Sequence, residues 1–385
     1  MTGKHNGQVK ILIATGIYPP DLGGPATLLT ELPGALKKAG MDIKVITYSD
    51  TALSEQEKQE DMVWRISRQS PCSKISYFWR MWRLSGRCDI IYATDTYSVG
   101  YFAYLIKKLT GKKYIIRFAG DSAWETASAR GWIKDYIVDF QNKKYGRRIE
   151  KMKKRRAKIL AGADSVIAVS NFIADVAKAI GAAEKNIRVI YNAVDFFGEL
   201  PQKTRPAAPT LVFAGRLMPW KGVGMMLDVV AELKKEIPDI IFEVLGDGPE
   251  MESLKEQARK LSIEQNVKFR GRVSEPESHK IFSRSTIFVL NTNYEGLPHS
   301  VLNAVAVGLP VITTSIGGNT EIVQSGENGL LVPYNDQKAW ITAVKTLLND
   351  EALREKFIQN GKETLEKFKW EKLVAETVAV FNELK

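Results

Sequence analysis

The sequence predicts an α/β protein built from two doubly wound domains, and three observations support this. First, each half of the chain alternates short apolar runs with amphipathic segments of helical length, the pattern of parallel sheets. Second, residues 196–208 are rich in proline and lack any apolar period, as expected of a linker. Third, a length of 385 residues and a hydrophobic content of 44% suit two ordinary globular domains.

The first domain is predicted to span residues 1–195. Segments 27–40 and 98–111 are amphipathic and end in glycine, a common helix stop. No G-x-G-x-x-G follows the first strand, where the chain reads GIYPPDLGG, so a nicotinamide dinucleotide is disfavoured. The expected strands are KILIATG (10–16), DIKVITY (42–48), DIIYATD (89–95), KYIIRFA (113–119), DSVIAVS (164–170) and IRVIYN (187–192).

The second domain is predicted to span residues 209–367. Ligands of doubly wound sheets bind at the carboxyl ends of the strands, so we expect a ligand cleft between the two domains. A final helix in 368–385 is expected to cross back towards the first domain, although ordinary core packing is equally consistent with its apolar stripe. The expected strands are TLVFAG (210–215), IIFEVLGDG (240–248), NVKFRG (266–271), TIFVLNT (286–292), PVITTS (310–315) and GLLVP (329–333).

Several protein classes are disfavoured by composition. No apolar run approaches the roughly 20 residues that span a bilayer, and the polar start is unlike a secretory signal. The two cysteines, Cys72 and Cys88, show neither a disulfide framework nor metal-ligand spacing. Of the three histidines, only His299 lies in a motif. We therefore expect a cytoplasmic protein with reduced thiols and no metal or cofactor.

The positive charge is concentrated in the first half of the chain. Residues 1–200 contain 32 Lys and Arg against 20 Asp and Glu, within a total net charge of +11. Segment 141–159 is strongly basic, and segment 73–87 mixes cations with aromatic residues. This pattern favours peripheral binding to an anionic membrane. The alternative is a solvated basic face over aromatics buried in the core. Nucleic acid is disfavoured because no nucleic-acid-binding signature accompanies the charge.

Two motifs in the second half carry chemistry. Arg216 and Lys221 lie in the loop after the strand 210–215, where fixed cations suit a diphosphate; alternatively they are surface cations. In YEGLPHSVLN (294–303) a helix is expected to begin near Pro298, with free amides facing an anion. Glu295 cannot attract phosphate, so it would accept hydrogen bonds from hydroxyls, unless it is only a helix N-terminal charge. Phosphate beside hydroxyls indicates a nucleotide sugar. The amides concerned are those of Leu297, Ser300 and Val301.

The ordered set of motifs resembles the GT-B glycosyltransferases of the retaining family 4, also described as glycosyl transferases group 1. The resemblance covers nearly the whole chain, densely in the second half and more thinly in the first. It implies two Rossmann-like domains facing across a cleft. The motifs are YPPDLGG (18–24), GRLMPWKG (215–222), GDGPE (246–250), YEGLPHSVLN (294–303), GLPVITTSIGGNTE (308–321) and SGENGLLVP (325–333).

The resemblance assigns roles to individual residues. Arg216 and Lys221 match the pair that holds the donor diphosphate, and Glu295 matches the first acid of an E-x7-E motif, which contacts the donor sugar. Asn303 falls where the second acid usually binds the ribose. Gly23 and Gly24 match the glycine loop of the first domain, Gly317 and Gly318 would lie near the donor, and His299 either contacts phosphate or fills a surface position.

Two departures from the family pattern matter. A neutral amide at Asn303 forms weaker hydrogen bonds than a carboxylate, and losing ~1 kcal/mol costs less than tenfold in affinity, so we expect retuned donor binding. Asp121 lies in YIIRFAGDSAWE (114–125), where the chain reads Ala119-Gly120-Asp121 and many relatives carry a histidine before the glycine. It either orients the donor sugar or acceptor hydroxyl, or caps a helix. Asp95, also after a strand, is a weaker candidate.

The expected activity is metal-independent transfer, with retention, from a UDP- or GDP-sugar to a glycan or lipid-linked acceptor in cell-envelope or surface polysaccharide synthesis. A phosphate oxygen would take the acceptor proton, while Arg216, Lys221 and the helix amides stabilise the leaving diphosphate. The candidate catalytic residues are therefore Glu295, Asp121, Arg216 and Lys221. The alternatives are a non-catalytic nucleotide-sugar-binding subunit, a sugar phosphorylase and a nucleotide-sugar epimerase. The oligomeric state is not predicted.

Overall fold

The computed structural model describes the chain except for residues 1–7, 20–23, 50–61, 194–203 and 205. The chain divides into two compact units, residues 1–192 with 371–385, and residues 193–370. Each unit has its own parallel sheet with helices on its faces, so the predicted class of two doubly wound α/β domains is confirmed.

The first unit contains a seven-stranded sheet in the order β3-β2-β1-β4-β5-β6-β7, and its described strand pairs are parallel. The order starts from β1 and winds outward in both directions, as in dinucleotide-type folds. The edge strand β3 was not predicted, because it is short and only half-buried. The strands are β1 (Lys10–Ala14), β2 (Asp42–Ser49), β3 (Val63–Ser67), β4 (Ile90–Ala93), β5 (Lys113–Phe118), β6 (Ser165–Ala168) and β7 (Ile187–Val189).

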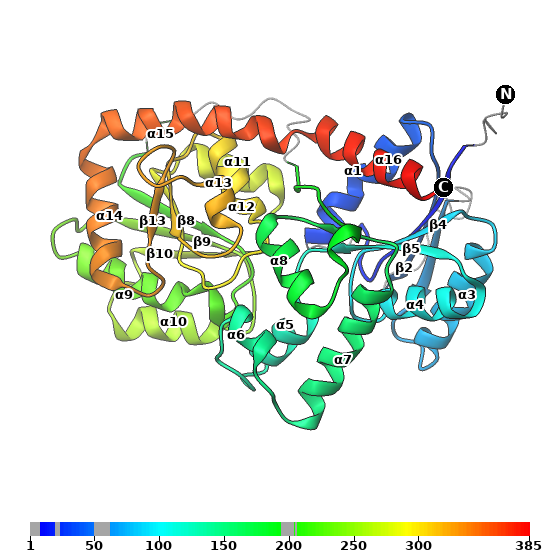
Figure 1. Ribbon diagram of the computed structural model, residues 1–385. Helices are drawn as coiled ribbons and strands as arrows, with labels where there is room; N and C mark the ends of the chain where they lie inside the picture. The colour runs from blue at the N-terminus through cyan, green and yellow to red at the C-terminus, as the bar shows by residue number, and fades with distance from the viewer. Residues whose placement is uncertain (1–7, 20–23, 50–61, 194–203, 205) are drawn as a thin grey trace. The chain divides into compact units, whose positions relative to one another are not determined.

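Helices cover both faces of this sheet. Figure 1 shows α1 and α16 on one face and α3, α4 and α7 on the other. The helices of this unit are α1 (Gly24–Lys38), α3 (Ser73–Ser85), α4 (Val99–Thr110), α5 (Ser122–Ala129), α6 (Ile137–Asn142), α7 (Arg147–Gly162), α8 (Asn171–Ile180) and α16 (Trp370–Leu384), with a 3-10 turn at Glu184–Asn186.

The C-terminal helix α16 completes the core of the first unit. Phe381 is buried and meets the Tyr92 ring of β4 edge-on, with 5.6 Å between ring centroids. At the end of the helix, Lys113 Nζ donates a hydrogen bond to the carbonyl oxygen of Leu384 at 2.7 Å. A stripe of apolar residues on α16 is therefore used within this unit. The domain boundaries drawn from the sequence stay predictions.

The second unit contains a six-stranded parallel sheet in the order β10-β9-β8-β11-β12-β13. Each of these strands coincides with an apolar run identified in the sequence. The strands are β8 (Thr210–Ala214), β9 (Ile241–Leu245), β10 (Val267–Gly271), β11 (Ile287–Leu290), β12 (Val311–Thr314) and β13 (Leu330–Val332).

Figure 1 shows α9 and α10 on one face of this second sheet and α11 and α12 on the other. The helices are α9 (Val223–Leu233), α10 (Met251–Lys260), α11 (Glu275–Ser283), α12 (His299–Ala306), α13 (Asn319–Ile322), α14 (Gln337–Asn349) and α15 (Glu351–Thr364), with 3-10 turns η2 (Pro219–Lys221) and η3 (Leu365–Phe368).

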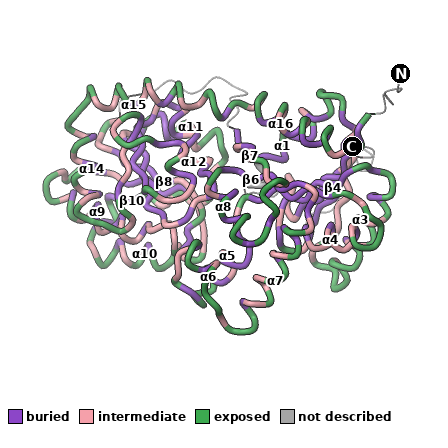
Figure 2. Tube along the Cα trace, in the orientation of Figure 1, coloured by how far each residue is buried: buried purple, intermediate pink, exposed green. Residues whose placement is uncertain are grey.

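Burial explains why the strands could be recognised. The central strands β4, β6, β11 and β12 are buried at every position, and Figure 2 shows buried strands beneath helices with exposed outer faces. Parallel strands covered on both faces read as continuous apolar runs. Among the described helices, none has the length and apolar character needed to cross a membrane.

Candidate active site

The structure brings Lys221 and Glu295 together at the carboxyl edge of the second sheet. Lys221 ends the turn η2 after β8, and Glu295 follows β11, which pairs directly with β8. Although the two residues are 74 positions apart in the sequence, Lys221 Nζ forms an ion pair with Glu295 Oε1. Their side chains are only 14% and 12% exposed. A cation and an acid thus lie side by side where doubly wound sheets bind their ligands.

Arg216 lies in the same loop and is exposed. Within the described residues its guanidinium has no hydrogen bond or ion pair. Because a guanidinium presents several donors in a planar fork, an unengaged arginine beside a lysine is well suited to a diphosphate.

Polar residues at the end of β11 hold the Lys221 loop, and sequence reasoning missed them. Asn291 is fully buried and its Nδ2 donates to the Gly222 carbonyl oxygen at 3.1 Å. Thr292 Oγ1 donates to the Trp220 carbonyl oxygen at 3.1 Å. Gly222 has a positive φ of 54°, and a Cβ there would lie 2.4 Å from Asn291 Nδ2. The sequence feature that could have revealed these two residues is a pair of polar side chains directly after the apolar strand β11.

The GDGPE motif supports the Arg216 loop through close backbone packing. A Cβ on Gly246, whose φ is 135°, would lie 1.9 Å from the Gly215 carbonyl oxygen. A Cβ on Gly248 would lie 2.4 Å from the Leu217 carbonyl oxygen, and Leu217 N donates to the Asp247 carbonyl oxygen at 3.1 Å. Only glycine permits such a close approach of the two backbone segments. This packing explains why the motif carries glycine at positions 246 and 248.

Gly317 and Gly318 have a comparable role at the Glu295 loop. The Gly318 amide donates to the Glu295 carbonyl oxygen at 3.0 Å. A Cβ on Gly318 would lie 2.1 Å from the Gly296 carbonyl oxygen, and Gly317 adopts a positive φ of 59°. The two glycines therefore fix the loop that carries Glu295, a role that the sequence analysis left unassigned.

Near the start of α12, three backbone amides were expected to be free of hydrogen bonds within the chain, and two of them are. Helix α12 begins at His299, with Pro298 as N-cap. In the described part of the chain, the N–H groups of Leu297 and Ser300 have no hydrogen-bond partner. The expectation for Val301 needs correction, because its amide donates to the Pro298 carbonyl oxygen at 3.1 Å in a tight first turn. Contacts of His299, Leu297, Ser300 and Val301 with a donor stay predictions.

Asn303 lies one turn into α12 and bonds to a residue of α11. Its Nδ2 donates to Glu275 Oε1 at 3.2 Å. Its Oδ1 is buried and, among the described residues, has no hydrogen-bond partner. A buried acceptor beside a carboxylate calls for a donor such as a hydroxyl.

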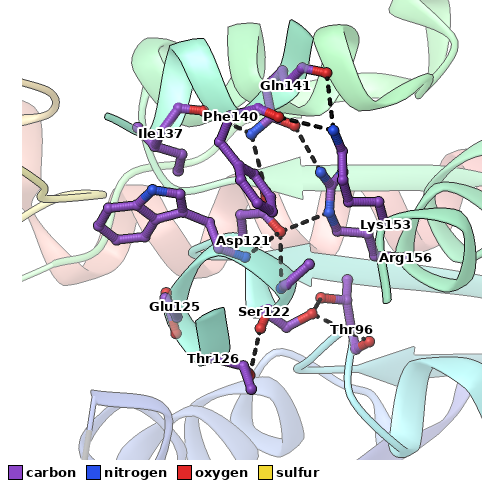
Figure 3. A network of polar contacts seen from close by, with 12 residues as sticks. Thr96, Asp121, Ser122, Glu125, Thr126, Ile137, Phe140, Gln141, Lys153 and Arg156 are labelled. Carbon is purple, nitrogen blue, oxygen red and sulfur yellow. Dashed lines mark hydrogen bonds and ion pairs between the residues drawn. The ribbon is translucent and has the colours of Figure 1, made fainter. Parts of the chain in front are cut away.

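Asp121 has the role of helix cap and ion-pair partner in the structure. It is fully buried at the N-cap of α5, and its Oδ1 accepts from Ala123 N at 3.0 Å and from Trp124 N at 3.4 Å. Arg156 Nε of α7 lies 2.7 Å from Oδ1, and Gln141 Nε2 donates to Oδ2 at 3.0 Å. Figure 3 shows this network. The helix-cap alternative is therefore observed for Asp121, and its role in orienting the donor sugar or the acceptor hydroxyl stays a prediction.

Asp95 lies at the end of β4 against the loop that follows β1. Its Oδ1 accepts from Tyr97 N at 2.8 Å, and a Cβ on Gly16 would lie 3.1 Å from its Oδ2. Burial raises the pKa of Asp95 to about 6, opposed by backbone amides at the start of α4. Gly24 is the first residue of α1, and Gly23 lies outside the described residues.

Two family models together match most of the chain. "Glycosyltransferase Family 4" matches residues 22–196, and "Glycosyl transferases group 1" matches residues 198–364. The first covers the seven-stranded unit from α1 to β7, without β1 and α16, and the second covers most of the unit that contains Lys221 and Glu295.

Relatives match over different lengths. An uncharacterized glycosyltransferase of Methanocaldococcus jannaschii is 25% identical over 98% of this chain and 99% of that protein. A lipopolysaccharide core biosynthesis glycosyltransferase of Rhizobium meliloti is 30% identical over 41% of this chain and 45% of that protein. This full-length match is to a protein described only by its class.

Solved structures match the whole chain at low identity. Sucrose-phosphate synthase from Thermosynechococcus elongatus has a TM-score of 0.81 at 18% identity, covering 98% of this chain and 99% of that one. HepE of Anabaena in complex with UDP-glucose has a TM-score of 0.77 at 17% identity, covering 97% and 100%. At these identities the likeness establishes the fold.

Proposed function

Because the chain belongs to family 4 of the GT-B glycosyltransferases, we propose that it transfers a sugar, with retention, from a UDP- or GDP-sugar to a glycan or lipid-linked acceptor. The observation that carries this proposal is the Lys221–Glu295 pair at the carboxyl edge of the second sheet. The two opposite charges compensate each other in this ion pair. The donor diphosphate would bind Lys221, and the sugar hydroxyls would donate to Glu295.

The proposed catalysis is electrostatic. Arg216 is unengaged within the described part of the chain, and the amides of Leu297 and Ser300 are unpaired there, so these donors are available for charge that grows on the departing diphosphate. Preorganised donors of this kind are commonly the largest catalytic contribution. A phosphate oxygen would take the acceptor proton on the face that the leaving group vacates. The cationic side chains would supply the charge stabilisation without a metal ion.

Structural likeness to a solved protein also supports a nucleotide sugar as the donor. HepE, a structural neighbour, has been solved with UDP-glucose. The same fold with cation, acid and free amides at one edge suits the same class of donor. Fold likeness alone does not select the base or the sugar, so the proposal covers UDP- and GDP-sugars.

The acceptor proposal comes from the surface of the first unit. On α3, Ile75 and Trp79 are 61% and 54% exposed, and Trp79 stacks on Trp82 with 5.1 Å between centroids. Arg80 and Arg83 are exposed on the same helix. Exposed aromatics beside cations favour the interface of an anionic membrane. We therefore propose peripheral membrane binding and a lipid-linked or cell-envelope glycan acceptor.

The core-packing alternative for the aromatics of α3 holds for only part of the helix. Tyr77 is fully buried and donates from its hydroxyl to the Ile46 carbonyl oxygen at 2.8 Å. Phe78 and Trp82 are half-buried. The exposed aromatic surface is thus limited to one side of the helix.

The proposed activity is tested by release of nucleoside diphosphate from UDP- and GDP-sugars without acceptor. A glycosyltransferase is expected to release it slowly from its own donor, and the anomer of the freed sugar, read by NMR, reports retention. A non-catalytic binding subunit would be stabilised against heat by the same ligand yet release nothing.

A further inference from the structure

The contact between α11 and α12 in the second unit has a consequence for donor recognition. Glu275 is the first residue of α11, just after β10, and Asn303 lies one turn into α12, after β11. Both helices thus begin at the carboxyl ends of strands, the edge where such sheets bind ligands. Asn303 Nδ2 donates to Glu275 Oε1 at 3.2 Å and ties the two helices together.

This hydrogen bond fixes which way the Asn303 amide points. An ionised carboxylate can only accept hydrogen bonds, so Glu275 selects the NH2 side of the amide. The carbonyl side, Oδ1, is then directed elsewhere. Oδ1 is buried and has no donor among the described residues, and a buried acceptor without a donor costs free energy. A ligand hydroxyl would supply the missing hydrogen bond.

We infer that Glu275 is a positioning residue of the donor site: it orients Asn303 so that Oδ1 accepts a hydrogen bond from a ribose hydroxyl of the donor. The inference rests on the proposed function, since it requires a nucleotide. It also explains the departure at position 303, because Glu275 supplies from α11 the negative charge that an asparagine lacks.

The surroundings of Glu275 favour a single carboxylate in this place. The Glu275 side chain is 45% exposed, and among the described residues the basic group within 4.0 Å of its carboxylate is His279 Nε2, at 3.9 Å. Burial lowers the pKa of His279, so its imidazole is mostly neutral at neutral pH and does not cancel the charge. A glutamate at position 303 would place a second carboxylate within hydrogen-bond reach of the first. Like charges so close disfavour each other's ionisation.

If Glu275 orients Asn303, completing the E-x7-E motif should weaken nucleotide binding. Restoring the acid with Asn303→Glu is expected to weaken nucleotide binding, by about tenfold or more, although it completes E-x7-E. Adding Glu275→Gln to this variant is expected to recover most of the loss, because the glutamine amide can donate to the new carboxylate. In the double variant the acid would lie on α12, at position 303, and the amide on α11, at position 275.

The test is calorimetric titration of the full chain with UDP, GDP and their 2′-deoxy and 3′-deoxy forms. Wild type is expected to prefer one ribonucleotide over a deoxy form. Glu275→Gln alone is expected to lose most of that preference with little change in melting temperature. Glu277→Gln, an exposed neighbour on α11, is the matched control and is expected to bind like wild type.

Two results would overturn the inference while leaving the proposed function intact. One is that Asn303→Glu and Glu275→Gln each weaken nucleotide binding and that the double variant loses the product of the two factors, with no recovery. The other is that Glu275→Gln weakens ribonucleotide and deoxynucleotide by the same factor, as a purely structural tie between helices would. If wild type binds none of the nucleotides, the proposed function fails together with the inference.

Discussion

At the scale of single residues, Asp121 and Asn303 are each held by a side chain from a neighbouring helix. Asp121 could be recognised as a possible helix cap from the residues around it, and the structure shows that cap. Its partner Arg156 lies on α7 and was visible in the sequence only as one of ten cations in segment 141–159. The same holds for Asn303 and Glu275, whose contact depends on how two helices pack.

The structural role of Asp121 predicts a large loss of stability in Asp121→Asn. Asparagine still caps a helix, but Arg156, whose side chain is 3% exposed, would become a buried cation that has lost its ion-pair partner. Removing one partner of a buried ion pair costs about 3–5 kcal/mol. Urea denaturation should show a loss of this order in the free energy of unfolding.

Asp175→Asn is the control for this measurement, because Asp175 is exposed and pairs with Lys178 at 3.7 Å on the surface. A loss below about 0.5 kcal/mol is expected there. Should Asp121→Asn keep wild-type stability while turnover collapses, Asp121 would have to be catalytic after all.

At the scale of elements, burial decided what could be predicted. In the second unit, β8, β9, β11 and β12 could be predicted because they are buried at nearly every position and read as continuous apolar runs. The edge strand β3 was missed because its half-buried VWRIS gives no continuous apolar run. The glycine motifs could be found in the sequence, but the backbone contact that requires each glycine depends on two loops that are far apart in the sequence.

The packing of the GDGPE loop predicts that Gly246→Ala disables the donor site. Its Cβ would lie 1.9 Å from the Gly215 carbonyl oxygen, so one backbone segment has to move and the Arg216 loop moves with it. We expect lower stability, by about 1–3 kcal/mol, and a raised KM for the donor. Gly271→Ala is the control. Gly271 has a positive φ of 65° but open space around it, so this variant introduces backbone strain without a steric clash. A donor KM that shifts equally in both variants would contradict the packing explanation.

At the scale of the whole molecule, the two halves of the chain differ in net charge and in exposed aromatic residues. The excess of Lys and Arg lies within the first 200 residues, and the exposed Trp79 of α3 belongs to the same unit. Composition could predict this asymmetry, whereas the side of α3 that faces solvent emerges only from the fold. The charge asymmetry favours an anionic partner over a solvated basic face, and we propose that α3 is the helix that would meet this partner.

This surface predicts binding to anionic liposomes at low salt. The full chain should sediment with vesicles of phosphatidylglycerol and stay in solution with vesicles of phosphatidylcholine, because each cation near an anionic surface adds about 1 kcal/mol. Trp79→Ala with Arg80→Gln and Arg83→Gln is expected to lose most of this binding. A variant with Lys255→Gln and Lys260→Gln, in the second unit, should bind like wild type. Equal sedimentation of all three proteins would contradict the assignment to α3.

The central claim is that the Lys221–Glu295 site of the second unit binds and activates a nucleotide sugar. Its most direct test is the initial rate of nucleoside diphosphate release from the preferred UDP- or GDP-sugar, in wild type, in Lys221→Met and in Lys235→Met. Lys235 is an exposed lysine of the same unit, paired with Glu232 at 2.6 Å. We predict that Lys235→Met keeps the wild-type rate and that Lys221→Met loses about 100-fold or more, the scale of one lost electrostatic contact to the transition state. Equal rates in the two variants would contradict the claim.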